Sequence, residues 1–134
     1  MKNLVDFINE GRRKVAPVKL DNKMYQAAAD AVCKEYRHYD DPRSKAELIK
    51  YLKNFAGNVY LDDMDLVVGD KTVGEMWDDG TLSFPLGFPK ELAMAIRDEF
   101  AYNTGEGSGD PTDYYIIIGD NDNCEWDEYA ETQG

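Results

Sequence analysis

Residues 72–85 read Thr72-Val73-Gly74-Glu75-Met76-Trp77-Asp78-Asp79-Gly80-Thr81-Leu82-Ser83-Phe84-Pro85, and this stretch decides the fold. Two short segments with Val, Trp and Phe flank Asp79-Gly80. The Asp-Gly pair suits the positive φ angles of a tight turn between antiparallel strands. We therefore expect a β-hairpin here.

More β structure is expected on both sides of the hairpin. Residues 58–68 contain alternating apolar and polar side chains, and Gly69-Asp70-Lys71 resembles the turn that joins them to the hairpin. Further along, Tyr114-Tyr115-Ile116-Ile117-Ile118 is a continuous apolar run of strand length. Such a run is typical of a strand with neighbours on both sides.

The segment before the strands predicts helices. Residues 2–9 place their apolar side chains on one helical stripe. A second helix is expected over residues 22–38, after the favourable N-cap Asp21. Asp40-Asp41-Pro42 should end it.

Two further helices have clear start signals. Ser44-Lys45-Ala46-Glu47 matches a capping box, in which the first and last side chains satisfy each other's backbone amides, and Gly57 suits the end of that helix. A fourth helix is expected over residues 89–102, with Pro89 in its first turn.

Together these elements predict an α+β fold with about four helices packed on a small, mainly antiparallel sheet. The 134 residues suit a single domain, 1–134. Within it we expect a leader helix over residues 1–11 and an acidic, partly flexible tail over residues 120–134.

The charge of the chain is divided unevenly. Residues 62–134 contain 19 acidic and three basic residues, a net charge of −16, whereas residues 1–61 contain 12 basic and eight acidic residues, a net charge of +4. A surface this acidic repels phosphate, so we expect no direct binding to nucleic acid and no binding to anionic membranes. The expected partner is a protein with a basic surface, such as a host nucleic-acid enzyme.

If the fold gathers the acidic side chains on one face, they form a partner-binding surface with a nucleic-acid-like field. Trp77 and Phe84 are candidate apolar anchors, although core packing is expected for at least one of them. The residues predicted to contact the partner are Asp62, Asp63, Asp65, Trp77, Asp78, Asp79, Asp98 and Glu99. The alternative is ordinary solubilising charge.

Other motifs predict little chemistry. His38 is the only histidine, and no nucleophile motif lies near it. Residues 120–131 resemble part of a calcium loop, but Cys124 and Glu125 replace its oxygen donor and its glycine. The glycine-rich segment 105–109 lacks the lysine of a phosphate loop. We expect no catalytic residue, no metal, no cofactor and no enzymatic activity, with Cys33 and Cys124 as free thiols.

The first eleven residues, Met1-Lys2-Asn3-Leu4-Val5-Asp6-Phe7-Ile8-Asn9-Glu10-Gly11, resemble the capsid-targeting leader of internal head proteins in T-even-like bacteriophages. In that family a prohead protease cuts after the glutamate of an Ile/Leu-x-Glu pattern. The resemblance implies cleavage between Glu10 and Gly11 and packaging with the phage genome. The alternative is an ordinary N-terminal helix.

These observations predict a phage-type acidic protein that inhibits a host enzyme as a DNA mimic, like anti-restriction or anti-CRISPR proteins. One alternative is a packaged internal or structural virion protein without inhibitory activity. Another is a small enzyme that depends on its acids or on a metal they hold. No segment is apolar enough to span a membrane, so the expected location is the host cytoplasm or the virion.

Overall fold

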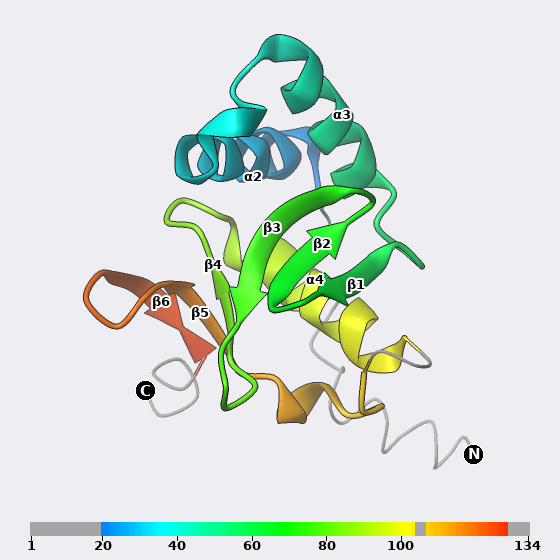
Figure 1. Ribbon diagram of the computed structural model, residues 1–134, viewed down its shortest axis with the longest axis vertical. Coiled ribbons are helices and arrows are strands. Elements are labelled where there is room, and N and C mark those ends of the chain that lie inside the picture. The colour runs from blue at the N-terminus through cyan, green and yellow to red at the C-terminus, as the bar shows by residue number, and fades with distance from the viewer. Residues whose placement is uncertain (1–19, 104–106, 129–134) are drawn as a thin grey trace.

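The computed structural model describes residues 20–103 and 107–128, which have an α+β fold (Figure 1). Six strands form one sheet in the order β1-β2-β3-β4-β5-β6. All neighbouring pairs are antiparallel except β4 and β5, which are parallel. The strands are β1 (Val59–Asp62), β2 (Asp65–Val68), β3 (Lys71–Met76), β4 (Leu82–Phe84), β5 (Ile116–Gly119) and β6 (Cys124–Asp127).

Three α-helices and two short 3-10 helices occur in the described residues. They are α2 (Asn22–Glu35), η1 (Arg37–Tyr39), α3 (Pro42–Lys53), α4 (Lys90–Tyr102) and η2 (Pro111–Asp113). The predicted fold class is confirmed. Of the four helices expected, three are present, and the one expected over residues 2–9 lies outside the described residues, as does the leader over residues 1–11.

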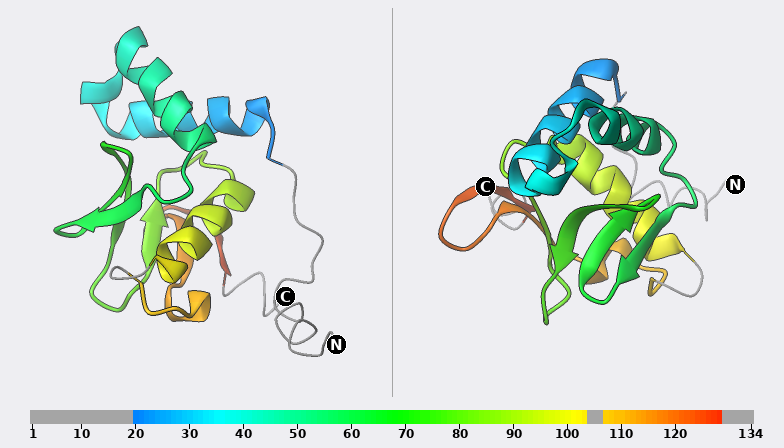
Figure 2. Two further views of the ribbon diagram at one scale, coloured as in Figure 1. Left: turned by 90° about the vertical axis from the view of Figure 1, so that its right-hand side faces the viewer. Right: turned by 45° about the horizontal axis from the view of Figure 1, so that its top comes forward.

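The sheet is covered on one face. Helix α4 packs behind the strands, and α2 and α3 pack together at one end of the sheet (Figures 1 and 2). Leu92, Ile96 and Phe100 recur every four residues along α4, and all three are fully buried. No described helix crosses the strands on the opposite face, which is turned toward the viewer in Figure 1. We call it the open face.

The central hairpin forms as predicted. The amide of Trp77 donates to the carbonyl of Thr81 at 2.8 Å, and Gly80 adopts a φ of 92° in the turn. Glycine suits this position because the left-handed region is strained for other residues. Of the turn predicted at residues 69–71, Gly69 and Asp70 form the turn that joins β2 to β3, and Lys71 is the first residue of β3.

Helix α3 begins at Pro42, three residues earlier than its expected first helical residue Lys45, and Ser44 is not its N-cap. Asp41 is the N-cap, and its carboxylate accepts hydrogen bonds from the amides of Arg43 and Ser44 at 3.0 and 2.9 Å. Pro42 then occupies the first turn, where its missing amide hydrogen costs nothing. The helix therefore starts at the Asp41-Pro42 pair and not at the capping box that begins with Ser44.

Replacing Asp41 with alanine is expected to lower the thermal unfolding midpoint at pH 7, and to lower it less at pH 3. Hydrogen bonds from the amide and the hydroxyl of Ser44 hold the pKa of Asp41 below its usual 3.8 in the folded state. Its contribution to stability is therefore complete above the unfolded-state pKa and is lost as the pH falls through the lower folded-state pKa. Circular dichroism melts at both pH values measure the difference. Asp41→Asn keeps the acceptor and should cost less; an equal penalty for Asp41→Ala at both pH values contradicts the assignment.

Two other elements differ from the prediction. Helix α2 is capped by Asp21 as expected but ends at Glu35, and the chain continues in η1. Where an acidic tail was expected from residue 120, residues 124–127 form the edge strand β6. Trp126 pairs with Ile118 and packs against the core, and this contact orders an otherwise polar segment. Residues 129–134 lie outside the described part.

Candidate functional site

Two hairpin tips bring most of the predicted acidic residues to one end of the sheet. Strands β1 and β3 run in the same direction, so the β1–β2 turn and the β3–β4 turn lie at the same end. We call the residues gathered there the acidic sheet end. They are all exposed, and they are Asp62, Asp63, Asp65, Glu75, Asp78 and Asp79.

Several of these carboxylates are direct neighbours. Asp62 is paired with Asp65 across β1 and β2, and Asp65 is paired with Glu75 across β2 and β3. Directly opposite side chains in an antiparallel pair lie on the same face, with Cβ atoms about 5 Å apart. Like charges at such positions oppose folding. The sequence therefore tolerates electrostatic repulsion at this end of the sheet.

Basic residues of the acidic half lie elsewhere. Lys71 is at the far end of β3, where its ammonium contacts Glu47 at 3.1 Å and Asp70 at 3.7 Å. Arg97 is buried in α4, and the Lys90 ammonium lies 5.4 Å from the centre of the Trp126 ring. Across residues 20–103 and 107–128, no basic side chain forms an ion pair with the acidic sheet end.

Asp98 and Glu99 do not join this group. They lie on α4, on the covered face, and are only partly exposed. A carboxylate oxygen of Asp98 is 2.8 Å from Nε of Arg97. Glu99 accepts a hydrogen bond of 2.7 Å from the amide of Gly57. Both side chains therefore have structural contacts within the domain.

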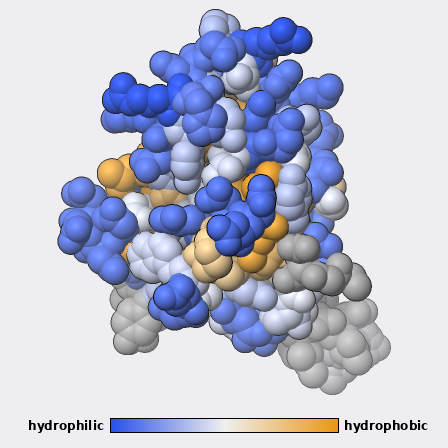
Figure 3. All heavy atoms as spheres, in the orientation of Figure 1, coloured by the Kyte–Doolittle hydropathy of each residue, from blue (hydrophilic) through white to orange (hydrophobic). Residues whose placement is uncertain are grey.

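The two candidate apolar anchors, Phe84 and Trp77, lie in different environments. Phe84 is 1% exposed and packs in the core against Phe88. Trp77 is half-buried at the end of β3 and lines a hollow of about 430 Å³ on the open face. The other residues around this hollow are Asp79, Thr81, Tyr115, Ile117, Asn121 and Asp127. In Figure 3, hydrophilic side chains cover most of the open face around a hydrophobic patch over the sheet.

The residues predicted to contact the partner did not include Glu75, Tyr115 or Asp127. Alternation along β3 was a usable signal for Glu75, because its two neighbours, the buried Gly74 and the half-buried Met76, belong to the opposite face of the strand. Tyr115 belongs to an apolar run that predicted burial on both faces. Asp127 falls in the segment that predicted a tail.

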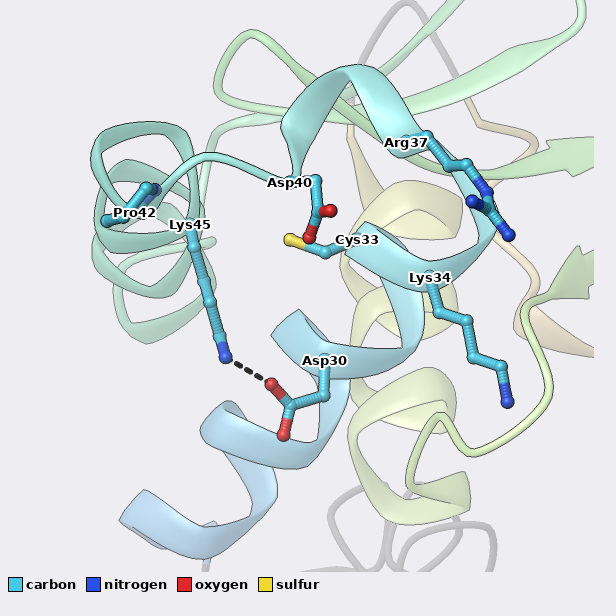
Figure 4. A pocket seen from close by; sticks show the side chains of 7 residues that line it. All are labelled: Asp30, Cys33, Lys34, Arg37, Asp40, Pro42 and Lys45. Atoms are coloured by element: carbon cyan, nitrogen blue, oxygen red, sulfur yellow. Dashed lines mark ion pairs between the residues drawn. The ribbon is translucent and has the colours of Figure 1, made fainter.

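A second hollow of about 580 Å³ lies between α2, η1 and α3 (Figure 4). Asp30 and Lys45 form an ion pair across it, and the Cys33 thiol donates to the carbonyl of Tyr39 at 3.1 Å. Burial raises the pKa of Cys33, so the thiol stays protonated at neutral pH and is a poor nucleophile. Both Cys33 and Cys124 are free.

The remaining motifs have local structural contacts. His38 is exposed in η1, with its ring centre 4.1 Å from that of Tyr39. A carboxylate oxygen of Asp120 accepts hydrogen bonds from the amides of Asp122 and Asn123 and so closes the β5–β6 turn. In the described part of the chain, no three metal-ligating side chains gather, and no helix has the length and apolar character to cross a membrane.

Comparison with known proteins returned no matching protein-family model, no matching curated protein and no matching solved structure.

Proposed function

We propose that this protein is an acidic binding protein that occupies a basic, nucleic-acid-binding surface of a host enzyme. It would act as a DNA mimic of the anti-restriction or anti-CRISPR type. The observation that supports this proposal most is the acidic sheet end: six exposed carboxylates from two hairpin tips, with no ion-pair partner among the described basic residues. Such a field attracts a basic surface over distances of about 8 Å in physiological salt.

The arrangement of the carboxylates favours recognition over solubility. Charge that serves only solubility can be spread over the surface, where repulsion between carboxylates is small. Here Asp62, Asp65 and Glu75 occupy adjacent positions on three neighbouring strands, which costs folding stability. A binding site explains that cost, because a basic partner relieves the repulsion when it docks.

The N-terminal resemblance to phage leaders supplies the biological setting of the proposal. A protein packaged with a phage genome and delivered with it would meet host nucleases at once. Those enzymes hold DNA through lysine and arginine side chains on its phosphates. The acidic sheet end presents the same sign of charge to these side chains.

The triple variant Asp62→Asn, Asp63→Asn, Asp78→Asn is expected to bind the partner about tenfold more weakly, because each exposed charge pair contributes a few tenths of a kcal/mol to 1 kcal/mol. The full chain is immobilised and exposed to bacterial lysate at about 50 and about 500 mM salt. Nucleic-acid enzymes should be retained at low salt, released at high salt and displaced by duplex DNA. The enzymes retained are then assayed for inhibition by the free protein.

The matched control is Asp40→Asn, Asp70→Asn, Asp122→Asn, which removes three exposed carboxylates from other parts of the surface. Both triple variants change the net charge equally, so a general charge effect would weaken them equally. The proposal fails if the control loses as much binding as the tip variant, or if retention is the same at both salt concentrations.

A further inference from the structure

The hollow beside Trp77 combines aromatic walls with carboxylates at its rim. Ile117 belongs to β5, Tyr115 directly precedes β5, and Thr81 directly precedes β4. Ile117 is the β5 member of a pair with Asp127 on β6, so the carboxylate lies beside the apolar floor on the open face. The volume of about 430 Å³ is within the range of sites that take a small ligand or a single side chain.

Two hydrogen bonds orient the carboxylates of the rim. Asp79 accepts from the amide of Thr81 at 3.0 Å, and Asp127 accepts from the hydroxyl of Tyr115 at 3.2 Å. Hydrogen bonds from the hydroxyl and the amide of Thr81 hold the pKa of Asp79 below its usual value, so this carboxylate is ionised at neutral pH. The hollow is therefore lined by oriented carboxylates as well as by aromatic rings.

This chemistry selects a cation with a flat shape. The face of an indole or phenol ring attracts a cation, and an adjacent carboxylate adds a charge-assisted hydrogen bond. A guanidinium group satisfies both, because it stacks on a ring while its N–H groups point to a carboxylate in the plane. An ammonium group is a compact point charge that stays more strongly hydrated. A phosphate is repelled by Asp79 and Asp127.

We propose that the hollow beside Trp77 is the anchor site for an arginine side chain of the partner protein. This inference rests on the proposed function, since it specifies how the same partner docks. The acidic sheet end attracts the basic surface from a distance, and the hollow takes one arginine from it. Buried arginine and tryptophan contacts dominate many protein interfaces, whereas exposed charges around them contribute mainly to the association rate.

The test uses three blocked peptides of equal length that contain four arginines, four lysines or four citrullines, the last being a neutral isostere of arginine. Each is titrated into the full ¹⁵N-labelled chain while the indole N–H signals of Trp77 and Trp126 are followed. We expect the arginine peptide to bind about three- to fivefold more tightly than the lysine peptide and to shift the Trp77 signal. The Trp126 signal serves as an internal reference, and the citrulline peptide should not bind.

Trp77→Leu should abolish the preference for arginine, so that the arginine peptide binds this variant no more tightly than the lysine peptide does. Equal affinities of the wild-type chain for the two cationic peptides would overturn the inference, as would a preference that persists in Trp77→Leu or an unmoved Trp77 signal. These failures are distinct from failure of the proposed function. If both cationic peptides bind equally and Asp62→Asn, Asp63→Asn, Asp78→Asn weakens both, the acidic sheet end recognises charge and only the arginine anchor is wrong.

Discussion

Replacing Phe84 with alanine is expected to lower the free energy of unfolding by about 3–5 kcal/mol. Phe84 is 1% exposed on β4, and its ring centre lies 4.8 Å from that of Phe88. Removing the ring loses its transfer free energy and leaves a cavity under the strand that joins the antiparallel hairpins to β5. Urea denaturation followed by far-UV circular dichroism measures the change in the free energy of unfolding.

Trp77→Ala is the matched control, because Trp77 lies on the same hairpin but is only half-buried. We expect it to cost less than about 2 kcal/mol, since much of the indole already faces water. The two variants thus separate folding from recognition: Phe84→Ala should unfold easily, and Trp77→Ala should fold but lose its preference for arginine peptides. A cost below about 1 kcal/mol for Phe84→Ala would show that the ring is not packed as described.

The contrast between these two aromatic residues marks what the sequence can and cannot predict. Asp79-Gly80 predicted the turn, because few other dipeptides adopt its backbone angles easily. The same dipeptide did not predict which of the two side chains, Trp77 or Phe84, is buried in the core. The pairing of β2 with β3 shifts register between Leu66 and Val67, which interrupts the simple alternation of faces. Such a shift depends on tertiary pairing and leaves no distinct local signature.

The grouping of the acidic residues follows partly from topology. In a series of antiparallel strands every second turn lies at the same end of the sheet, so the β1–β2 and β3–β4 turns bring Asp62, Asp63, Asp78 and Asp79 together. Asp79-Gly80 predicted the second of these turns, but the turn within residues 58–68 was not predicted. Asp98 and Glu99 belong to a helix, and charge alone cannot show that a helix lies behind the sheet. Asp98 contacts its sequence neighbour Arg97, whereas Glu99 accepts from the amide of Gly57, which is 42 residues away and could not be predicted from the sequence.

Edge strand β6 was missed for a related reason. Strands are predicted from runs of β-branched and aromatic residues, and Cys124–Asp127 contains only one aromatic residue and two acids. Short, charged edge strands are common in sheets because they discourage pairing with other molecules. Their stability comes from the neighbouring strand, here β5, and not from their own composition.

Arg97→Met is expected to lower the free energy of unfolding by about 3–5 kcal/mol, as is typical when a buried ion pair loses one partner. Arg97 is 6% exposed and connects three parts of the fold. Its guanidinium donates to both carboxylate oxygens of Glu128 at 3.0 and 3.1 Å, and to the carbonyls of Tyr114 at 2.7 Å and Pro111 at 3.3 Å. Methionine keeps the apolar stem but removes the guanidinium donor from Glu128 and from the carbonyl of Tyr114, whereas the carbonyl of Pro111 still accepts from the amide of Tyr114.

The geometry of the guanidinium, and not only its charge, should decide the outcome. Burial opposes the charged form of Arg97, but hydrogen bonds and charge from Glu128 and Asp98 raise its pKa overall, so it remains protonated throughout the accessible pH range. Arg97→Lys retains the charge but cannot donate to Glu128 and two carbonyls at once, and we expect it to recover less than half of the loss. Lys23→Met, at an exposed position on α2, removes the same charge and should cost almost nothing. Because a buried pair is poorly screened, the loss for Arg97→Met should persist at about 1 M salt. If Arg97→Lys is as stable as the wild type, a single positive charge is sufficient at this position, and the bidentate contact with Glu128 does not stabilise the fold.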